Sequence, residues 1–317
     1  MPGTPALNWG AGALQARLAP LLPGLRVEVV ASVGSTNTEL LERARRAGRD
    51  WQLASTPTEL APSLLVAEHQ TQGRGRQGKA WQSSAGASLT FSLALPLAPV
   101  DWSGLSLAVG LALVEALDPP SPGQPARLGL KWPNDLLLRA TTGHTTDPTE
   151  PIGLKLGGIL IETVMLGRQR VAVIGIGLNL LPQATPALSW GYACLQALRP
   201  DLDAPAALAV LAPPLLQALA AFEQHGFAPL RQRFAARDLL LGRRVNTSLP
   251  DLPGGLADGV DETGTLWLRV TDGSGERRLP VASGEVSLRA DPDSAAAPPV
   301  PEMPAAWPPP PPSPASC

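Results

Sequence analysis

The chain changes character near residue 243, and this change divides it into two parts that fold differently. From residue 25 to about residue 240, apolar strand patterns alternate with helix patterns. From residue 243 to residue 289, short strand patterns are separated by the turn sequences DLPGG, DETG and TDGSG. This order predicts an α+β protein with a large sheet-and-helix domain at residues 25–240 and a small all-β domain at residues 241–290.

The first part carries well-defined element patterns. Strands are expected at 25–30, 64–67, 89–95, 129–132, 154–164 and 170–178, and helices at 103–117 and through much of 189–238. The segment Thr36-Asn37-Thr38-Glu39 has the form of a capping box. It predicts a helix that begins there and ends at Gly48.

The remaining segments offer little to a core. Residues 1–24 are expected to form an N-terminal extension, and residues 139–152 a polar hairpin insertion. Eleven of the 36 prolines lie in residues 291–317, including the run Pro308–Pro312. Such a segment favours polyproline II and buries little, so a disordered tail is expected there.

Composition excludes several classes of protein. A formal net charge of −2 argues against a protein that coats nucleic acid. Two cysteines, Cys194 and Cys317, cannot build a disulfide framework or an all-cysteine zinc site. The N-terminus lacks the pattern of a signal peptide, and the longest apolar stretch identified, 105–117, is too short for a bilayer and carries Glu115. A cytoplasmic protein without a membrane contact is expected.

Residues 73–79 (GRGRQGK) form a basic, glycine-rich loop. It carries three positive charges, and no acidic residue follows until Asp101. Glycines let the backbone approach a ligand, and backbone N–H groups can cradle an anion, so a phosphate or carboxylate is the expected ligand. A solvated mobile loop is the alternative. The segment also matches the dinucleotide and P-loop patterns, but no helix pattern follows it and Ala80 stands where a P-loop has Ser or Thr.

Three further segments place polar groups at strand ends. Residues 131–135 (KWPND) combine a cation, a stiff turn and two oxygen-bearing side chains, which suits a nucleotide or a metal–phosphate group. Residues 155–162 (KLGGILIE) carry a lysine two residues before a glycine pair, and residues 175–179 (GIGLN) end a glycine-rich strand in an amide. Taken singly, each also matches an ordinary turn, a surface lysine or a core strand.

Taken together, these segments resemble the biotin–protein ligase family in order and nearly in spacing. The resemblance rests on Ser35-Thr36-Asn37, Gln70 with the glycine-rich loop and Trp81, and the three segments just described. It covers about residues 32–289, where residues 284–289 (GEVSLR) resemble the family's C-terminal end. It implies a class II synthetase-like catalytic domain followed by a small SH3-like β-barrel. It also implies activation of biotin with MgATP to biotinyl-5′-AMP, and transfer of biotin to a lysine of a biotin carboxyl carrier protein.

The resemblance assigns roles to individual residues. Biotin-binding positions are implied at Ser35, Thr36, Asn37, Gln70, Arg74, Gly75, Arg76, Lys155, Gly157 and Gly158. ATP-binding positions are implied at Gly73, Trp81, Lys131, Asn134, Asn179, Glu285 and Arg289. Arg76 and Lys155 are the expected catalytic cations, and Asp135 is the candidate magnesium ligand or base partner. Gln77 stands where family members commonly have arginine, so one charge of the loop is missing.

Two alternatives remain open at this point: a lipoate-type acyl protein ligase, and a non-catalytic biotin or nucleotide sensor on the same scaffold. Some relatives carry an N-terminal helix-turn-helix domain and repress transcription. Only 34 residues precede Ser35, so DNA binding is not expected. The expected partner is a carrier protein such as a subunit of acetyl-CoA carboxylase, and a homodimer is left open.

Overall fold

The structure is a computed structural model that describes residues 7–53, 61–139, 152–183, 191–273, 275–281 and 289–290. The expected hairpin insertion, apart from its two end residues, and the whole of the expected C-terminal tail lie outside the described residues.

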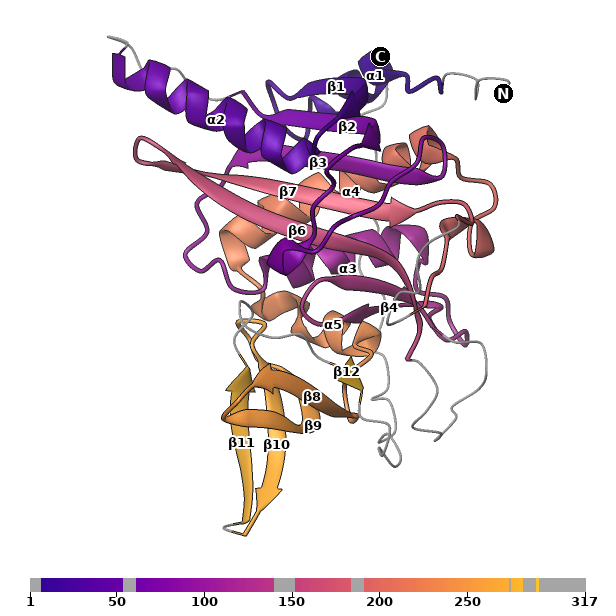
Figure 1. Ribbon diagram of the computed structural model, residues 1–317, viewed down its shortest axis with the longest axis vertical. Helices are drawn as coiled ribbons and strands as arrows, with labels where there is room; N and C mark the ends of the chain where they lie inside the picture. The colour runs from indigo at the N-terminus through magenta and orange to yellow at the C-terminus, as the bar shows by residue number, and fades with distance from the viewer. Residues whose placement is uncertain are drawn as a thin grey trace, which may run out of the picture.

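A seven-stranded mixed sheet forms the larger part of the molecule (Figure 1). Its strand order is β1-β2-β3-β7-β6-β5-β4. The strands are β1 (Arg26–Val33), β2 (Ser63–Gln70), β3 (Ser88–Pro96), β4 (Leu128–Lys131), β5 (Asp135–Leu138), β6 (Leu154–Leu166) and β7 (Gln169–Asn179). β1 and β2 are parallel, and the other neighbouring strands are antiparallel.

Helices cover both faces of this sheet. α2 (Thr36–Leu53) packs on one face through a small cluster that includes Leu40, Leu65 and Val173. α3 (Leu105–Leu117) and α4 (Ala204–His225) pack on the other face, and Figure 1 shows them behind the sheet. Because successive side chains of a strand alternate between faces, Leu64 and Ile174 belong to this second, larger core. The result is a three-layer arrangement in which β3 is buried on both faces.

Two details of α2 differ from the expectation. Ser35 caps the helix, since its Oγ accepts a hydrogen bond from the N–H of Thr38 at 3.4 Å, so the cap lies one residue earlier than the predicted box. The helix also continues past Gly48 to Leu53. A Cβ at position 48 would lie 3.1 Å from Cδ1 of Leu166. This glycine therefore makes room for a side chain of the sheet and does not end the helix.

The longest apolar helix is α4, and the expectation that residues 105–117 are the longest apolar stretch was wrong. By length and composition, α4 is the one helix among the described residues that could cross a membrane. Its buried face, which includes Leu208, Leu215 and Phe222, belongs to the core that it shares with α3. Packing inside the protein therefore accounts for its apolar composition.

Smaller elements complete this part of the molecule. α1 (Ala11–Leu18) and β5 have no counterpart among the expected elements, and α1 buries Leu14 and Leu18 against the core. The remaining ones are α5 (Arg231–Arg237) and the short 3-10 segments η1 (Arg76–Gly78), η2 (Leu195–Ala197) and η3 (Ala228–Leu230).

The expected small all-β part is an antiparallel sheet with the order β11-β10-β9-β8-β12. Its strands are β8 (Arg244–Leu249), β9 (Leu252–Val260), β10 (Leu266–Asp272), β11 (Gly275–Val281) and β12 (Arg289–Ala290). It lies at one end of the molecule in Figure 1. Val245, Ala257 and Leu268 join the same apolar core as the larger sheet, so the two sheets are packed together.

Two hydrogen bonds join the small sheet and its linker to the end of β4. The N–H of Leu239 donates to the carbonyl of Leu130 at 2.9 Å, and Nε1 of the fully buried Trp132 donates to the carbonyl of Gly264 at 3.0 Å. Gly264 has a φ of +83°, which favours glycine. The β9–β10 turn therefore helps to fix the position of the KWPND segment, through its hydrogen bond with Trp132.

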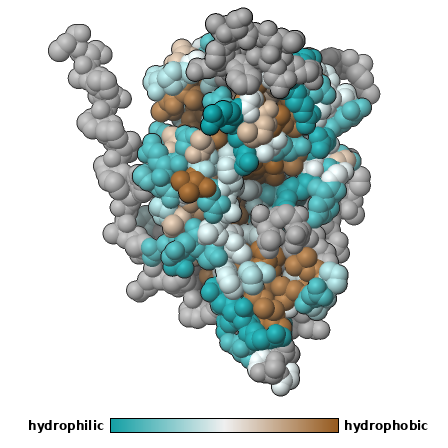
Figure 2. Space-filling view, turned by 90° about the vertical axis from the view of Figure 1, so that its left-hand side faces the viewer, coloured by the Kyte–Doolittle hydropathy of each residue, from teal (hydrophilic) through white to brown (hydrophobic). Residues whose placement is uncertain are grey.

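Apolar side chains on the surface are scattered. The face drawn in Figure 2 is largely hydrophilic, with separate apolar areas. Among the described residues, the exposed large apolar side chains are Leu21, Val100, Leu154, Met165 and Leu181.

Asp238, in the linker between the two sheets, is expected to make stability depend on pH. Its Oδ1 accepts from the N–H of Leu240 at 2.8 Å, whereas its Oδ2 is buried without a hydrogen-bond partner among the described residues. Burial raises the pKa of Asp238 from 3.8 to about 6, against the opposing effects of the backbone N–H groups of Leu240 and Leu241 and the charge of Arg139. The folded state therefore binds more protons than the unfolded state between these values, so this group's contribution to stability falls as pH rises through that window.

Asp238→Asn keeps the acceptor for Leu240 and removes the buried charge. We expect it to stabilise the protein at about pH 7.5 by on the order of 1–3 kcal/mol, and to have much less effect at about pH 4.5, where the carboxyl is already protonated. Thermal melts at the two pH values measure this, with the exposed Asp251→Asn as the control. An equal gain at both pH values would contradict the assignment.

Candidate active site

The topology of the larger sheet gathers the predicted motifs at one of its ends. β2 ends at Gln70 and β7 at Asn179, and both strands point the same way. β6 runs antiparallel to β7 and therefore begins at the end where β7 stops, with the segment around Lys155. β5 runs antiparallel to β6, and its first residue, Asp135, reaches this segment by pairing with Gly158. Lys131, the last residue of β4, pairs with Asp135. Residues that are far apart in the sequence thus line one site.

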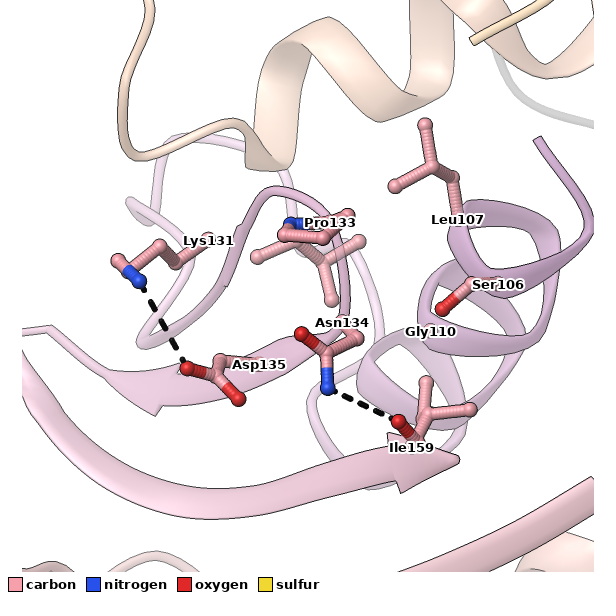
Figure 3. A pocket seen from close by; sticks show the side chains of 9 residues that line it. Ser106, Leu107, Gly110, Lys131, Pro133, Asn134, Asp135 and Ile159 are labelled. Atoms are coloured by element: carbon pink, nitrogen blue, oxygen red, sulfur yellow. Dashed lines mark hydrogen bonds and ion pairs between the residues drawn. The ribbon is translucent and has the colours of Figure 1, made fainter. Parts of the chain in front are cut away.

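Asp135 is the electrostatic centre of this site (Figure 3). Its Oδ1 accepts a hydrogen bond from Nζ of Lys155 at 2.7 Å, and its Oδ2 lies 3.7 Å from Nζ of Lys131. Burial lowers the pKa of Lys131 to about 8, with Asp135 opposing the shift and Lys155 and Lys79 adding to it. Positions 79, 131 and 155 hold all three lysines of the chain. Two of the chain's three lysines therefore pair with a single carboxylate, and the charge of the third acts on Lys131.

Arg76 reaches this centre from the glycine-rich loop. Its Nη1 donates to Oδ1 of Asn134 at 3.3 Å, and Nδ2 of Asn134 donates to the carbonyl of Ile159 at 2.9 Å. Burial lowers the pKa of Arg76, while the charge of Asp135 opposes the shift. A guanidinium remains charged despite such a shift. The site is thus strongly positive and partly dry, which suits an anion such as a nucleotide phosphate.

Lys155 is held firmly by its backbone. Its carbonyl accepts from the N–H of Ala193 at 3.0 Å and from Nδ2 of Asn179 at 3.1 Å, and its N–H donates to the carbonyl of Gly191 at 3.4 Å. The predicted nucleotide residue Asn179 therefore also fixes the backbone of the predicted catalytic lysine.

The glycine-rich loop is a compact turn. The carbonyl of Gly73 accepts a hydrogen bond from the N–H of Trp81 at 2.8 Å, and the N–H of Gly75 donates to the carbonyl of Lys79 at 2.7 Å. A Cβ on Gly73 would lie 2.3 Å from the carbonyl oxygen of Trp81, so a larger residue does not fit. Gln77 adopts a φ of +55°, a conformation that non-glycine residues rarely take.

The glycines of β7 and β6 lie where a neighbouring side chain packs directly against the backbone. A Cβ on Gly177 would lie 2.4 Å from the ring of Trp81, and one on Gly175 would lie 2.3 Å from Oδ1 of Asn37. On β6, a Cβ on Gly157 would lie 2.4 Å from the side chain of Leu178. Nε1 of Trp81 is buried and has no hydrogen-bond partner among the described residues, so it is a donor that a ligand can use.

Four of the predicted biotin residues, Ser35, Thr36, Asn37 and Gln70, form a buried, uncharged wall. The N–H and Oγ1 of Thr36 both donate to Oε1 of Gln70, at 2.8 Å and 3.1 Å. Nδ2 of Asn37 donates to the carbonyl of Leu160 at 3.1 Å and to Oε2 of Glu162 at 3.0 Å. The amide of Asn37 is thus already engaged by protein groups and serves as part of the wall.

Not every predicted residue can be placed. Glu285 lies outside the described residues, and Arg289 is described only as backbone in β12, paired with Asn246. Gly158 lies beside Lys155 and Asp135: a Cβ there would be 3.7 Å from Nζ of the lysine.

Sequence reasoning assigned no role to Ser92 and Glu162. Ser92 is fully buried and places its Oγ 2.6 Å from both Thr36 Oγ1 and Asn37 Oδ1. The sequence does hold a sign of this role: Ser92 is a hydroxyl residue in the middle of an apolar strand. A buried hydroxyl there predicts hydrogen-bond partners from another element.

The donor set does not fit a magnesium ion held by the protein. Among the described residues, no three His, Cys, Asp or Glu side chains form a cluster that could hold a metal. Asp135, the candidate ligand, is flanked by two ammonium groups, and Mg²⁺ is usually held by one or two carboxylates together with substrate phosphates. Asp135 is therefore the counter-ion of the two lysines, and magnesium would enter with the phosphates of its substrate MgATP.

Comparison with known proteins agrees with this geometry. Residues 32–179 match the model of the biotin/lipoate A/B protein ligase family. The chain is 35% identical to the biotin--[acetyl-CoA-carboxylase] ligase of Mycobacterium tuberculosis, over 82% of this chain and 88% of that protein. It is 33% identical to the bifunctional ligase/repressor BirA of Escherichia coli, over 84% of this chain and 75% of that protein. The structure of biotin protein ligase from Aquifex aeolicus in complex with biotin and ATP aligns with a TM-score of 0.61 and 25% identity, covering 85% of this chain and all of that one.

A cluster of cations beside a neutral polar wall suits an enzyme that handles an anionic nucleotide and an uncharged ring. The chain belongs to the biotin/lipoate A/B protein ligase family, and within it to the biotin–protein ligases.

Proposed function

We propose that this protein activates biotin with MgATP to biotinyl-5′-AMP and transfers the biotinyl group to a lysine of a biotin carboxyl carrier protein, such as a subunit of acetyl-CoA carboxylase. The observation that carries this proposal is the convergence of Lys131, Lys155 and Arg76 around Asp135 and Asn134, next to the uncharged wall. The names of the relatives support the same substrates, since one is a ligase for acetyl-CoA carboxylase and another was crystallised with biotin and ATP.

In the first step, a carboxylate oxygen of biotin attacks the α-phosphorus of ATP and pyrophosphate leaves. Two anions must approach each other, and negative charge concentrates on the α-phosphoryl oxygens. Lys155 and Arg76 are placed to offset that charge, because both reach the same centre and both are fixed by neighbouring groups. Lys131 adds a third positive charge from a buried position.

In the second step, the neutral amine of the carrier lysine attacks the acyl carbon of the adenylate. The amide bond forms, the bond to the phosphate oxygen breaks, AMP leaves and the amine releases a proton. The enzyme mainly has to position the two reactants and exclude water. The compact glycine-rich loop, with Arg76 lying on Asn134, is suited to that task.

We assign the residues as follows. Ser35, Thr36, Asn37, Gln70 and Gly75 line or support the biotin site, together with Arg74, Arg76, Lys155, Gly157 and Gly158. Gly73, Trp81, Lys131, Asn134, Asn179, Glu285 and Arg289 serve the nucleotide. The buried Trp81 donor and the engaged amides of the wall support this division.

We also propose the domain boundaries 1–24, 25–240, 241–290 and 291–317, with a class II synthetase-like fold for the larger domain and an SH3-like barrel for the smaller. The separate five-stranded antiparallel sheet supports the boundary near residue 241. We propose a cytoplasmic enzyme that does not bind DNA, and the formal net charge of −2 supports the second of these points. A homodimer and a monomer are distinguished by measuring the mass in solution.

Incubation with biotin, MgATP and a purified carrier domain tests the function. We expect release of pyrophosphate and a gain of one biotinyl mass on one carrier lysine, and neither product when lipoate replaces biotin. Background labelling of the enzyme itself is easy to map, because the chain has three lysines and one N-terminal amine. Use of lipoate in preference to biotin would favour the lipoate ligase alternative. Binding of biotin without pyrophosphate release would favour the sensor.

A further inference from the structure

We infer that Glu162 is a positioning residue that fastens the glycine-rich loop to the uncharged wall of the proposed biotin site. The inference rests on the proposed function and adds a residue to which no role has been assigned. Glu162 lies in the middle of β6, well away from Lys155 along the strand, and is mostly buried. Each of its two carboxylate oxygens contacts a different part of the site.

One oxygen holds the loop. Oε1 of Glu162 lies 3.4 Å from Nη2 of Arg74, whose Nη1 donates to Oγ1 of Thr38 at 3.2 Å. Arg74 stands between Gly73 and Gly75, which give the loop little stiffness of its own. The guanidinium is therefore gripped at two points, one on β6 and one on the first turn of α2.

The other oxygen holds the wall. Oε2 accepts from Nδ2 of Asn37 at 3.0 Å, and Oδ1 of Asn37 accepts from Oγ of Ser92 at 2.6 Å. Ser92 also lies 2.6 Å from Oγ1 of Thr36, which bonds to Gln70. A continuous chain of hydrogen bonds thus runs from the loop, through Glu162, to the predicted biotin residues.

The link between Arg74 and Glu162 depends on the buried end of this series of hydrogen bonds, at Asn37 and Ser92. An exposed Arg–Glu pair contributes little by itself, and the Arg74 side chain is 47% exposed. Asn37, however, is 3% exposed and Ser92 is fully buried. The Asn37 amide also packs directly against Gly175, where a Cβ would clash with it. The Glu162 carboxylate is therefore fixed in place by the core and offers Arg74 a preorganised partner.

The consequence is a specific kinetic pattern. Glu162 has no contact with Lys155 or Arg76 among the bonds described above, so its loss should spare the chemical step. Loss of the link should instead let the loop open. We expect Glu162→Gln to raise the KM for biotin and the dissociation rate of biotinyl-AMP by roughly 5- to 20-fold, with kcat changed by less than about 3-fold. Glutamine keeps the size of the side chain, but its amide would place a donor against Arg74 or Asn37, which also donate.

The test combines kinetics with a ligand-free measurement. Trypsin cleavage after Arg76 and Lys79 is followed in the wild type, Glu162→Gln, Glu162→Ala, Arg74→Ala and the double variant Arg74→Ala/Glu162→Ala. We expect faster cleavage in each of these variants than in the wild type, without ligand. We also expect Glu162→Ala to change adenylate dissociation much less in the Arg74→Ala background. Glu115→Gln is the matched control, because Glu115 is also mostly buried and pairs with Arg233 away from the site.

The outcomes separate this inference from the proposed function. Wild-type cleavage and adenylate retention in both Glu162 variants would overturn the inference, even if biotin transfer is normal. Equal effects of Glu162→Ala in the wild-type and Arg74→Ala backgrounds would also overturn it, since Glu162 would then act by another route. If the wild-type protein does not activate biotin, the proposed function fails, and the cleavage rates still decide whether Glu162 fastens the loop.

Discussion

Lys155→Ala is expected to slow pyrophosphate release by roughly 30- to 1,000-fold, which corresponds to about 2–4 kcal/mol of transition-state stabilisation. Lys155 offsets the negative charge that builds up as the biotin carboxylate meets the α-phosphate. The structure adds a second cost: without Lys155, the carboxylate of Asp135 loses its 2.7 Å partner and presents negative charge to the incoming anions. Pre-steady-state measurement of pyrophosphate release, with biotin and MgATP saturating, gives the size of the loss.

A double variant separates the effect of the unpaired Asp135 carboxylate from the loss of the Lys155 charge itself. In Lys155→Ala/Asp135→Asn the uncompensated carboxylate is gone, so part of the lost rate should return. Lys155→Arg should retain more activity than Lys155→Ala, since it keeps the charge but changes its geometry. Arg168→Ala, at the exposed β6–β7 turn at the other end of the sheet, is the control. A wild-type rate in Lys155→Ala would remove this lysine from the mechanism.

The motifs predicted the location of the site better than the bonds within it. Ser35, Gln70 and Asn179 meet at one end of the sheet because each lies at or just beyond the end of a strand that points that way. Lys131 and Asp135 come near them through the pairing of β5 with β6. Strand ends can be identified from alternation and from glycine. The mixed α+β architecture and the separate small sheet followed from the same patterns.

Pairings between distant side chains could not be predicted in this way. Asp135 was expected as a magnesium ligand or base partner. In the structure it pairs with lysines 4 and 20 residues away, which meet it only through the register of β4, β5 and β6. Glu162 and Ser92 stayed unassigned because their value depends on Asn37, which reaches them from another element. The length of α4 was missed for a different reason: alanine and proline also occupy much of the face that is not buried, so the polar side of the amphipathic pattern is weak.

The loop provides the second large effect. Arg76→Ala is expected to raise the dissociation rate of biotinyl-AMP by roughly 10- to 100-fold while changing the KM for biotin by less than about 3-fold. The difference arises because the guanidinium pairs with a phosphate, and biotin alone has none. In the structure Arg76 lies on Asn134 and is partly desolvated, with its pKa lowered by burial. It therefore has little reorganisation to undergo when the phosphate arrives.

Release of the adenylate into solution can also be tested by a labelling experiment, without rate measurements. Free biotinyl-AMP acylates exposed amines, so Arg76→Ala should label an unrelated lysine-rich protein added to the reaction, whereas the wild type should label the carrier alone. Arg76→Lys is the informative companion: it keeps one positive charge but cannot form the two parallel bonds of a guanidinium, and should leak at an intermediate rate. Gln77→Arg restores the charge that this loop lacks and should slow leakage below the wild-type rate. If Arg76→Ala retains its adenylate and its carrier selectivity, the cation that holds the phosphate must be Lys131 or Lys155, and the loop serves only to exclude water.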